Sequence, residues 1–402
     1  MQSDTRKRAI FISGFGWFDE RLEPVSEVLE EKGYDVEFYL SDYSHIDKSY
    51  IEHKNPRCNY LHVPAYKKNV SVGRIISHMV FGHKIKNVLR KKKPDLIYSL
   101  LPPNSVGPPC LAYKKQNSEC KYFVDIIDMW PGYLIPRVES KIAKHTKNDI
   151  VTSVMRGGWR LCNWILQKWA SMRNDSVAYA NHVFLECNLY KEELTKYIDD
   201  NTTTTLYLFK VIDDADRVLR CINERRLSYK KDKIVLGYLG SINHVIDIDR
   251  ICEVLSELVA RNVSIEFRIV GVGESKDKLI LAAKQTGASV KYYGRVFDRN
   301  EKLEILGGCD YGFNIMKSDV TVGLTIKSVD YFSMGIPIIN GIQGDTWDVV
   351  SRENIGVNLE GDYIDRILDM TEDRGSKAFE CFMRCFTRKA FQDEVRKALR
   401  EI

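Results

Sequence analysis

The chain alternates short apolar runs with longer amphipathic stretches, and this alternation predicts an α/β fold. In the first half, residues 8–16, 33–40, 95–101 and 121–128 are rich in Val, Ile, Tyr and Phe, which indicates strands. Helical patterns lie between them: from about Glu20 to Lys32, through the stretch ending at residues 90–93, and after Pro109. Strands and helices in this order are typical of a doubly wound parallel sheet.

The second half of the chain repeats the pattern. The strands that we expect there span 233–241, 264–273, 289–294, 309–315, 336–340 and 356–359. The sequence therefore predicts two Rossmann-like doubly wound domains that face each other across a cleft. The expected bounds are 1–210 for the first domain, 211–232 for a polar linker region, 233–380 for the second domain, and 381–402 for a helix that packs back on the first.

Composition narrows the class of protein. The chain has 402 residues and 44% hydrophobic content, enough to bury proper cores. Its 10 cysteines include no CxxC pair and no paired His spacing, which favours reduced thiols in a cytoplasmic protein over a disulfide framework or a zinc site. The N-terminus lacks a signal-peptide pattern, and no run approaches the ~20 apolar residues of a spanning helix.

The net charge of +5 is concentrated in one segment. Eleven Lys and Arg and no acidic residue lie between His53 and Pro94, so the rest of the chain carries about −6. The end of this segment, with Lys91, Lys92 and Lys93, reads as part of an amphipathic helix with apolar positions from Ile75 to Leu89. Each cation near an anionic leaflet contributes about 1 kcal/mol, so the helix could dock on a membrane. The alternative is a solvated helix end.

A second segment also suits a membrane interface. Trp159, Trp164 and Trp169 alternate with cations, and no acid lies between Asp149 and Asp175. The alternative interpretation is a buried interdomain helix. The aromatic residues match no RNA-binding motif, and we expect no nucleic-acid partner.

Two glycine loops follow predicted strands, where open α/β sheets bind ligands. Gly14 and Gly16 follow the first strand, and Gly271 and Gly273 follow the strand at 264–270. A dinucleotide fingerprint needs a third glycine that neither loop has, which argues against a nicotinamide cofactor. A tight turn into a helix is the alternative.

The segment from Val320 to Ile339 carries the clearest chemistry. Gly323 permits close backbone approach, and Thr325 can cap the helix that follows. Lys327 and Asp330 are three residues apart on that helix, so they lie on neighbouring parts of one face. A helix N-terminus with an ammonium suits a diphosphate, and a carboxylate can accept hydrogen bonds from vicinal sugar hydroxyls. An ordinary helix with a solvent-side Lys–Asp pair is the alternative.

This segment, with its G-x-P turn at Gly335 and Pro337, resembles the donor-binding signature of GT-B glycosyltransferases, especially glycosyltransferase family 4. Asp330 matches the second acidic position of the family motif, which holds the nucleotide ribose, whereas Val322 replaces the first. The resemblance implies a donor site formed by residues of several loops. They are Gly240, Ser241, Asn243, His244, Gly271, Gly273, Arg295, Gly323, Leu324, Thr325, Lys327 and Asp330.

The first half adds a related motif. The run Asp125-Ile126-Ile127-Asp128-Met129-Trp130-Pro131 resembles a D-x-W-P segment of family members that decorate bacterial surface polysaccharides. The resemblance implies that Asp128, with Asp125 behind it, acts from the acceptor side, and that Gly14 and Gly16 form an acceptor-side loop. A strand-end Asp that caps a turn is the alternative.

Together these features predict a hexosyltransferase that moves a sugar from a nucleotide-sugar to a membrane-associated, lipid-linked glycan in cell-surface polysaccharide synthesis, such as a capsule or exopolysaccharide. The resemblance implies a retaining reaction without a metal or other cofactor. We expect a cytoplasmic protein, peripheral on the inner face of the plasma membrane. Its oligomeric state stays open, and a homo- or hetero-oligomer is compatible with the sequence. The alternatives are a catalytically weakened GT-B scaffold that partners an active transferase, suggested by Val322, and a sugar-nucleotide epimerase of the same fold.

Overall fold

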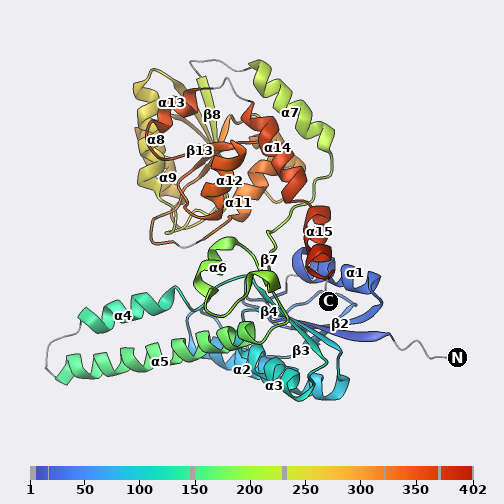
Figure 1. The fold of residues 1–402 in the computed structure, drawn as a ribbon. Coiled ribbons are helices and arrows are strands. Elements are labelled where there is room, and N and C mark those ends of the chain that lie inside the picture. Colours follow the sequence, from blue (N-terminus) through green and yellow to red (C-terminus); the bar gives the residue numbers. More distant parts are fainter. Residues whose placement is uncertain are drawn as a thin grey trace. The chain divides into compact units, whose positions relative to one another are not determined.

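The computed structural model describes residues 6–16, 18–144, 150–228, 233–320, 322–369 and 373–400. The chain forms two compact units (Figure 1). Unit 1 comprises Met1–Leu206 and Gln392–Ile402, and unit 2 comprises Tyr207–Phe391. Of the expected linker region, the last residues, 229–232, lie outside the described part of the chain.

Unit 1 is built on a parallel sheet of seven strands in the order β3-β2-β1-β4-β5-β6-β7. The strands are β1 (Lys7–Ser13), β2 (Tyr34–Ser41), β3 (Cys58–Leu61), β4 (Leu96–Leu101), β5 (Lys121–Ile126), β6 (His182–Leu185) and β7 (Thr203–Thr205). The order reverses beside β1, which is the switch point of a doubly wound sheet. The central strands β4, β5 and β6 are buried almost throughout, as parallel strands covered on both faces are.

Helices and short helical turns connect these strands. They are η1 (Phe18–Leu22), α1 (Glu23–Glu31), α2 (Val72–Lys92), η2 (Asn104–Val106), α3 (Gly107–Gln116), α4 (Leu134–Lys144), α5 (Ile150–Ala178), α6 (Asn188–Leu194) and η3 (Asp200–Thr202). Gly82 of α2 is required by close packing, because a Cβ there would lie 2.3 Å from the carbonyl oxygen of Ser105.

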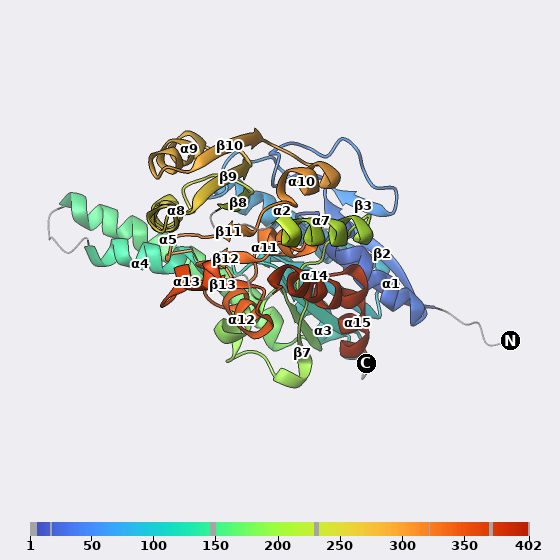
Figure 2. The same cartoon turned by 90° about the horizontal axis from the view of Figure 1, so that it is seen from above.

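Unit 2 has a parallel sheet of six strands in the order β10-β9-β8-β11-β12-β13. The strands are β8 (Lys233–Leu239), β9 (Ser264–Val270), β10 (Ser289–Gly294), β11 (Tyr311–Asn314), β12 (Ile338–Asn340) and β13 (Gly356–Asn358). Figure 2 shows the six strands in this order. The helices are α7 (Ala215–Ser228), α8 (Ile248–Ala260), α9 (Lys276–Gln285), α10 (Arg299–Leu306), α11 (Ile326–Ser333), α12 (Asp345–Glu353), α13 (Tyr363–Leu368) and α14 (Arg374–Cys385). The last helix, α15 (Arg388–Ala398), begins in unit 2 and continues into unit 1 from Gln392.

The two predicted doubly wound sheets are confirmed, and each strand that the pattern indicated is present. The sequence pattern missed β3, β6 and β7. These strands have four, four and three residues, too short to show a periodicity of their own. β7 is the run Thr203–Thr205, which has no apolar residue at all.

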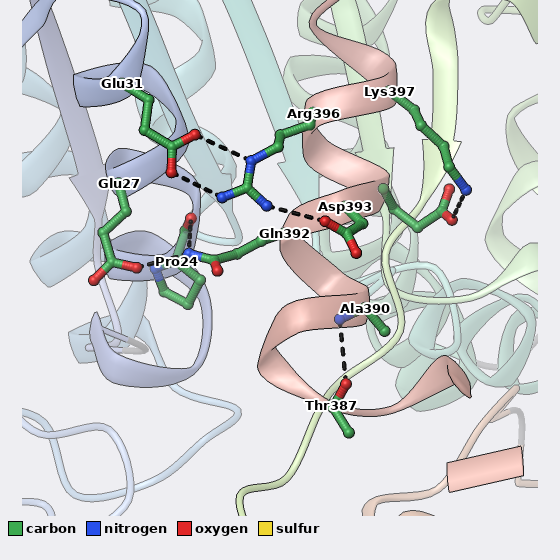
Figure 3. Close-up of polar contacts among 10 residues, drawn as sticks. Pro24, Glu27, Glu31, Thr387, Ala390, Gln392, Asp393, Arg396 and Lys397 are labelled. Atoms are coloured by element: carbon green, nitrogen blue, oxygen red, sulfur yellow. Dashed lines mark hydrogen bonds and ion pairs between the residues drawn. The ribbon is translucent and has the colours of Figure 1, made fainter. Parts of the chain in front are cut away.

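The C-terminal helix α15 lies against α1 within unit 1 (Figure 3). The guanidinium of Arg396 donates to both carboxylate oxygens of Glu31, at 3.0 and 2.8 Å. Gln392 donates to Glu27 at 2.6 Å and to the carbonyl oxygen of Pro24 at 3.3 Å. The residues from Gln392 onward therefore belong to the first compact unit, although the chain enters them from the second.

Helices α4 and α5 form a hairpin that extends from unit 1 (Figure 1). The ammonium of Lys141 lies over the ring of Trp159 at 4.3 Å and joins the two helices. Farther along α5, Leu161 and Trp164 are each 59% exposed, whereas Trp169 is buried. The expected membrane-contact residues Trp159 and Trp164 thus lie on one projecting element.

Helix α2 packs differently from the amphipathic helix that the sequence predicted. Its buried face includes the polar residues Arg74, Ser77 and His78 beside Phe81, Ile85 and Leu89. Ile76 and Met79, expected on the apolar face, are each 49% exposed. At its end, Lys92 forms an ion pair with Glu37, while Lys91 and Lys93 are exposed. Searched over the described residues, the structure contains no helix with the length and apolar character needed to span a membrane.

Candidate functional site

Three buried asparagines in unit 2 form a ladder across the carboxyl ends of its sheet. Asn314, Asn340 and Asn358 end β11, β12 and β13 and lie in register. The side-chain amide of Asn314 donates to Asn340 at 3.0 Å, and that of Asn340 donates to Asn358 at 2.8 Å. Because each amide oxygen and nitrogen is used, the ladder fixes the loops that leave these strands.

The ladder continues into the N-terminus of α11. The hydroxyl of Thr325 donates to Asn314 at 2.9 Å and accepts from the backbone N–H of Ser328 at 3.1 Å. Thr325 therefore caps α11, as its sequence position predicted. Gly323 and Leu324 are buried just before the cap, and the carbonyl oxygen of Gly323 accepts from the backbone N–H of Thr346 at 3.1 Å.

Lys327 points from the first turn of α11 toward the end of β8. Its ammonium lies 3.3 Å from the hydroxyl of Tyr238 and 4.6 Å from the centre of that ring. A Cβ on Gly240 would lie 3.7 Å from Cε of Lys327. The aliphatic part of the lysine side chain therefore runs beside the loop after β8. Burial lowers the pKa of Lys327 to about 8, because the charged form loses solvation there. The side chain is thus a cation at neutral pH that gains from an anionic ligand.

The loops after β8 and β9 are packed backbone on backbone. The N–H of Gly240 donates to Val270 and that of Ile242 to Val272, both at 2.9 Å. A Cβ on Gly271 would lie 1.9 Å from the carbonyl oxygen of Gly240, and one on Gly273 would lie 2.1 Å from that of Ile242. Both glycines also have positive φ. The loop pairing therefore gives Gly271 and Gly273 a structural role that is independent of any ligand.

A pocket of about 110 Å³ opens at the side of α11. Asp330 and Ser333 of α11 line one side with Met334, which follows the helix, and Phe297 and Arg299 line another side around the start of α10. The segment from Lys210 to Asp214 closes it. The pocket combines apolar side chains with three carboxylates and three cations.

Asp330 pairs with Lys210 in this pocket, at 3.4 Å. Lys327 and Asp330, which are neighbours in sequence, thus point to different partners: Tyr238 on one side and Lys210 on the other. The alternative interpretation, an ordinary helix with a solvent-side pair of Lys327 and Asp330, is not what the structure shows. Lys210 and Phe297 were not singled out from the sequence, because only the fold brings their segments to α11.

The other residues expected in the donor site lie around the loop after β8. Ser241 accepts from the hydroxyl of Tyr238 through its carbonyl oxygen at 2.8 Å. The side chain of Asn243 accepts from the N–H of Val245 at 3.1 Å, which closes a turn. His244 is highly exposed, and its Nδ1 lies 3.4 Å from Oε1 of Glu274. The guanidinium of Arg295 lies 5.7 Å from the ring of Phe297, on the pocket wall.

In unit 1, Asp125 is held at the end of β5 in a fully buried ion pair. Nε and Nη2 of Arg21 each lie 2.7 Å from one of its carboxylate oxygens, and the hydroxyl of Tyr98 donates to it as well. Nη1 of Arg21 donates to the carbonyl oxygen of Leu206 at 2.5 Å. Asp125 and Arg21 have no exposed surface. This burial argues against the catalytic role expected for Asp125 and gives it a structural one.

Asp128 lies three residues farther on and keeps contact with solvent. Its carboxylate accepts from the N–H of Trp130 at 2.9 Å. Burial raises its pKa, whereas this hydrogen bond and the charges of Arg74 and Arg173 act in the opposite direction. Of the two expected catalytic carboxylates, Asp128 is the one that a ligand can reach.

Glu186 is a further carboxylate that the sequence patterns did not single out. It follows β6 directly, beside the end of β5, and its N–H donates to the carbonyl oxygen of Ile126 at 3.0 Å. Burial raises its pKa to about 8, with Asp125 and Asp128 acting in the same direction and Arg21 against them. A carboxylate at the end of a parallel strand is a candidate site residue, but the sequence pattern did not indicate β6 and so did not indicate Glu186.

Gly14 and Gly16 lie in the loop after β1. Gly14 is buried, and a Cβ there would lie 2.4 Å from Cδ of Pro103, so only glycine fits. Gly16 has φ of +81° and open space around it. The loop is thus at the carboxyl edge of the sheet, where it was expected, with one glycine needed for packing and one for its turn.

Comparison with known proteins identifies the fold. No protein-family model and no curated protein matches this sequence. Sucrose-phosphate synthase from Thermosynechococcus elongatus is similar in structure, with a TM-score of 0.61 and 14% identity over 98% of this chain and 99% of that one. HepE from Anabaena, solved with UDP-glucose, has a TM-score of 0.59 and 12% identity over 98% and 100%. The lipopolysaccharide outer core galactosyltransferase WaaB has a TM-score of 0.59 and 11% identity over 98% and 99%. The chain therefore has the two-domain GT-B fold of these glycosyltransferases.

Proposed function

We propose that the protein is a nucleotide-sugar-dependent glycosyltransferase that extends a membrane-associated glycan. The observation that carries the proposal is the arrangement around α11: a capped N-terminus, the ammonium of Lys327 beside the loop after β8, and Asp330 in the pocket beside the helix. The helix N-terminus and Lys327 would hold the diphosphate, and Asp330 would accept hydrogen bonds from the ribose. The nucleoside base would lie near Phe297.

The likeness to solved structures supports the donor class. HepE was solved with UDP-glucose, and WaaB is a galactosyltransferase by name. A uridine diphosphate sugar is accordingly the first donor to test, with guanosine and deoxythymidine counterparts beside it. Lys327 matters most here, because the leaving diphosphate gains negative charge as the glycosidic bond breaks.

Acceptor activation is assigned to unit 1. Asp128 is the exposed carboxylate at the carboxyl edge of its sheet, where it can orient an acceptor hydroxyl. The proposed reaction retains the anomeric configuration and needs no metal, as the resemblance to family 4 implies. In that mechanism the leaving phosphate takes the acceptor proton, so the reaction needs no second carboxylate.

The acceptor is proposed to be lipid-linked, in cell-surface polysaccharide synthesis on the inner face of the plasma membrane. Support comes from the hairpin of α4 and α5, which exposes Leu161 and Trp164 beside Arg160 and Lys168. Tryptophans and cations together suit the interface of an anionic leaflet. Lys91 and Lys93 add exposed charge at the end of α2.

Two measurements test this function. Release of nucleotide diphosphate from UDP-, GDP- and dTDP-sugars, with and without a lipid-linked acceptor, should show turnover that needs the acceptor. Conversion of the donor without any acceptor would favour the epimerase instead. Tight nucleotide binding without turnover would favour the catalytically weakened scaffold. Val322, which stands in place of a carboxylate, is the observation that suggests this alternative.

A further inference from the structure

Buried polar atoms without partners gather at the carboxyl edge of the sheet of unit 1. In the part of the chain that the structure describes, they include Nδ1 of His78, Oδ1 of Asn104, and Nε1 of Trp130 and Trp169. The rings of His78, Trp130 and Trp169 lie 5.8–6.1 Å apart, centre to centre. Buried polar atoms are normally satisfied, so a cluster of four marks a place for a polar partner, either ordered water or a ligand.

Most of these atoms are hydrogen-bond donors. An indole nitrogen can only donate, which accounts for Trp130 and Trp169. Nε of Arg74 donates to Nε2 of His78 at 3.5 Å, and this assigns the remaining imidazole proton to Nδ1. The side-chain nitrogen of Asn104 donates to the carbonyl oxygens of Trp130 and Trp169 at 3.1 and 2.9 Å, which leaves its oxygen as the single acceptor.

Arg74 adds a positive charge to this cluster. It is 4% exposed, and its guanidinium lies 4.5 Å from the ring of Trp130 and 5.6 Å from that of Phe15. Its Nη1 donates to the carbonyl oxygen of Asn69 at 2.9 Å, and it forms no ion pair with any described residue. A buried guanidinium without a carboxylate is unfavourable unless an anion joins it.

The surrounding charges favour an anion too. Burial and the charges of Arg74 and Lys48 lower the pKa of His45 to about 4. Burial, Arg74 and His45 together hold the pKa of His78 well below its ordinary value. Asp128 is the acidic group that acts on Arg74, and it is also the proposed acceptor-side carboxylate.

The cluster borders a cavity. Its free volume is about 10 Å³, room for about one water molecule, so an oxyanion enters only when neighbouring side chains move. His78 lines it together with Phe15, Tyr66 and Ser77. Of its lining residues, Phe15 follows β1 and Pro103 follows β4, so the cavity lies where parallel α/β sheets bind ligands.

We propose that His78, Trp130, Trp169 and Arg74 form a binding site for an oxyanion of the acceptor substrate. The inference rests on the proposed function, because it names the acid group of the molecule that receives the sugar. Two sources share this chemistry: the phosphate of a lipid-linked acceptor and the carboxylate of an acidic sugar. Three N–H donors and a guanidinium suit either group and suit a neutral sugar less well.

The test uses the two indoles as reporters. The chain has 6 tryptophans, so its indole N–H signals can be resolved by ¹⁵N NMR of the full chain and assigned with Trp130→Phe and Trp169→Phe variants. Titration with inorganic phosphate or with glucuronate, in the presence of saturating UDP, should shift the signals of Trp130 and Trp169 in a saturable way. Indole shifts with phosphate but not with glucuronate would assign the site to a phosphate group. Shifts with glucuronate but not with phosphate would assign it to an acidic sugar.

Variants show whether the cluster itself binds the anion. Trp169→Phe keeps an aromatic ring and removes an unsatisfied donor, so it should leave the unliganded protein at least as stable and weaken anion binding about tenfold. Arg74→Met should weaken it at least as much. Arg57→Met is the matched control, because Arg57 also lies over two aromatic rings but pairs with Glu23 and Glu30. Arg57→Met should bind as the parent does.

Three results would overturn the proposal: no saturable shift of either indole with phosphate or glucuronate, an equal shift with neutral glucose, or unchanged anion binding in Trp169→Phe. The first would mean that the cluster holds only water. Failure of the nucleotide proposal is separate, because UDP binding is measured in the same samples and depends on unit 2. Anion binding that needs Trp169 stands even if UDP does not bind.

Discussion

The carboxylate of Asp330 lies 3.4 Å from the ammonium of Lys210, and both line the pocket beside α11. The ion pair thus engages the carboxylate that we propose to bind the ribose hydroxyls. Bound ribose hydroxyls must therefore share Asp330 with Lys210 or displace it. The pair is partly exposed, so its own contribution is small, about 0–1 kcal/mol.

The first prediction concerns this pair. Asp330→Ala should reduce UDP affinity at least tenfold, because a carboxylate that accepts from hydroxyls is lost. Lys210→Met frees the same carboxylate and should leave UDP affinity unchanged or raise it about two- to fivefold, the equivalent of up to about 1 kcal/mol. Calorimetric titration of both variants with UDP measures this difference. Equal UDP affinity in Asp330→Ala and the parent chain would remove Asp330 from the site.

The second prediction concerns Lys327 and pH. Its pKa of about 8 lies below the ordinary lysine value, so the unfolded chain binds more protons than the folded one above pH 8, and stability should rise with pH there. A bound diphosphate favours the charged form, so affinity for a UDP-sugar should be level below pH 7.5 and fall as the pH rises through 8. Binding measured from pH 7 to 9 tests this. Lys327→Met should bind weakly at every pH, without the fall; a parallel fall in the variant would point to another group.

The third prediction concerns the asparagine ladder. Asn340→Leu leaves the amides of Asn314 and Asn358 without their partner, and each unsatisfied buried group costs about 1–3 kcal/mol. Urea unfolding should show the loss. Asn300→Ala is the control, since the Asn300 side chain bonds Arg217 at an exposed position, and it should stay within about 0.5 kcal/mol of the parent. If Asn340→Leu were as stable as the control, the ladder would not hold the loops.

The fourth prediction separates the two carboxylates of unit 1. Asp125→Ala leaves Arg21 as an unpaired buried charge and should cost about 3–5 kcal/mol of stability. Asp128→Asn should unfold within about 1 kcal/mol of the parent. It should nevertheless transfer sugar about 100-fold more slowly. Urea unfolding and a transfer assay together decide the matter; normal turnover by Asp128→Asn would exclude it from the reaction.

The fifth prediction concerns the membrane surface. Replacing Leu161 and Trp164 with serine should reduce cosedimentation with vesicles that contain anionic lipid, and so should neutralising Lys91, Lys92 and Lys93. Leu281→Ser is the control, because Leu281 of unit 2 is 61% exposed. UDP binding should be the same in all of these variants. Unchanged vesicle binding by the variant with serine at Leu161 and Trp164 would contradict a membrane contact of α4 and α5.

The fold was largely predictable from the sequence because buried parallel strands appear as apolar runs, as in β4 and β5. The cap at Thr325 was predictable too, since capping depends on residues a few positions apart. The partners of Lys327 and Asp330 were not, because Tyr238 and Lys210 are distant in the chain and meet α11 only in the folded unit.

The acceptor side shows the same limit. Asp125 and Asp128 are equivalent in a sequence motif, and only the burial of Asp125 against Arg21 distinguishes them. In the same way, the apolar positions of α2 gave no indication that Arg74 and His78 would face inward. Polar residues on a buried face are read as solvent-exposed by periodicity alone.

Nucleotide binding tests the central proposal most directly. Thermal unfolding of the full chain should be followed with UDP, GDP and dTDP, because a ligand that binds only the folded state raises the Tm. At least one nucleotide should raise the Tm of unit 2 in a saturable way, and Asp330→Ala should abolish that rise. A flat response to all three nucleotides and their sugars at millimolar concentration, or an equal response in Asp330→Ala, would contradict the assignment of this pocket to a nucleotide-sugar.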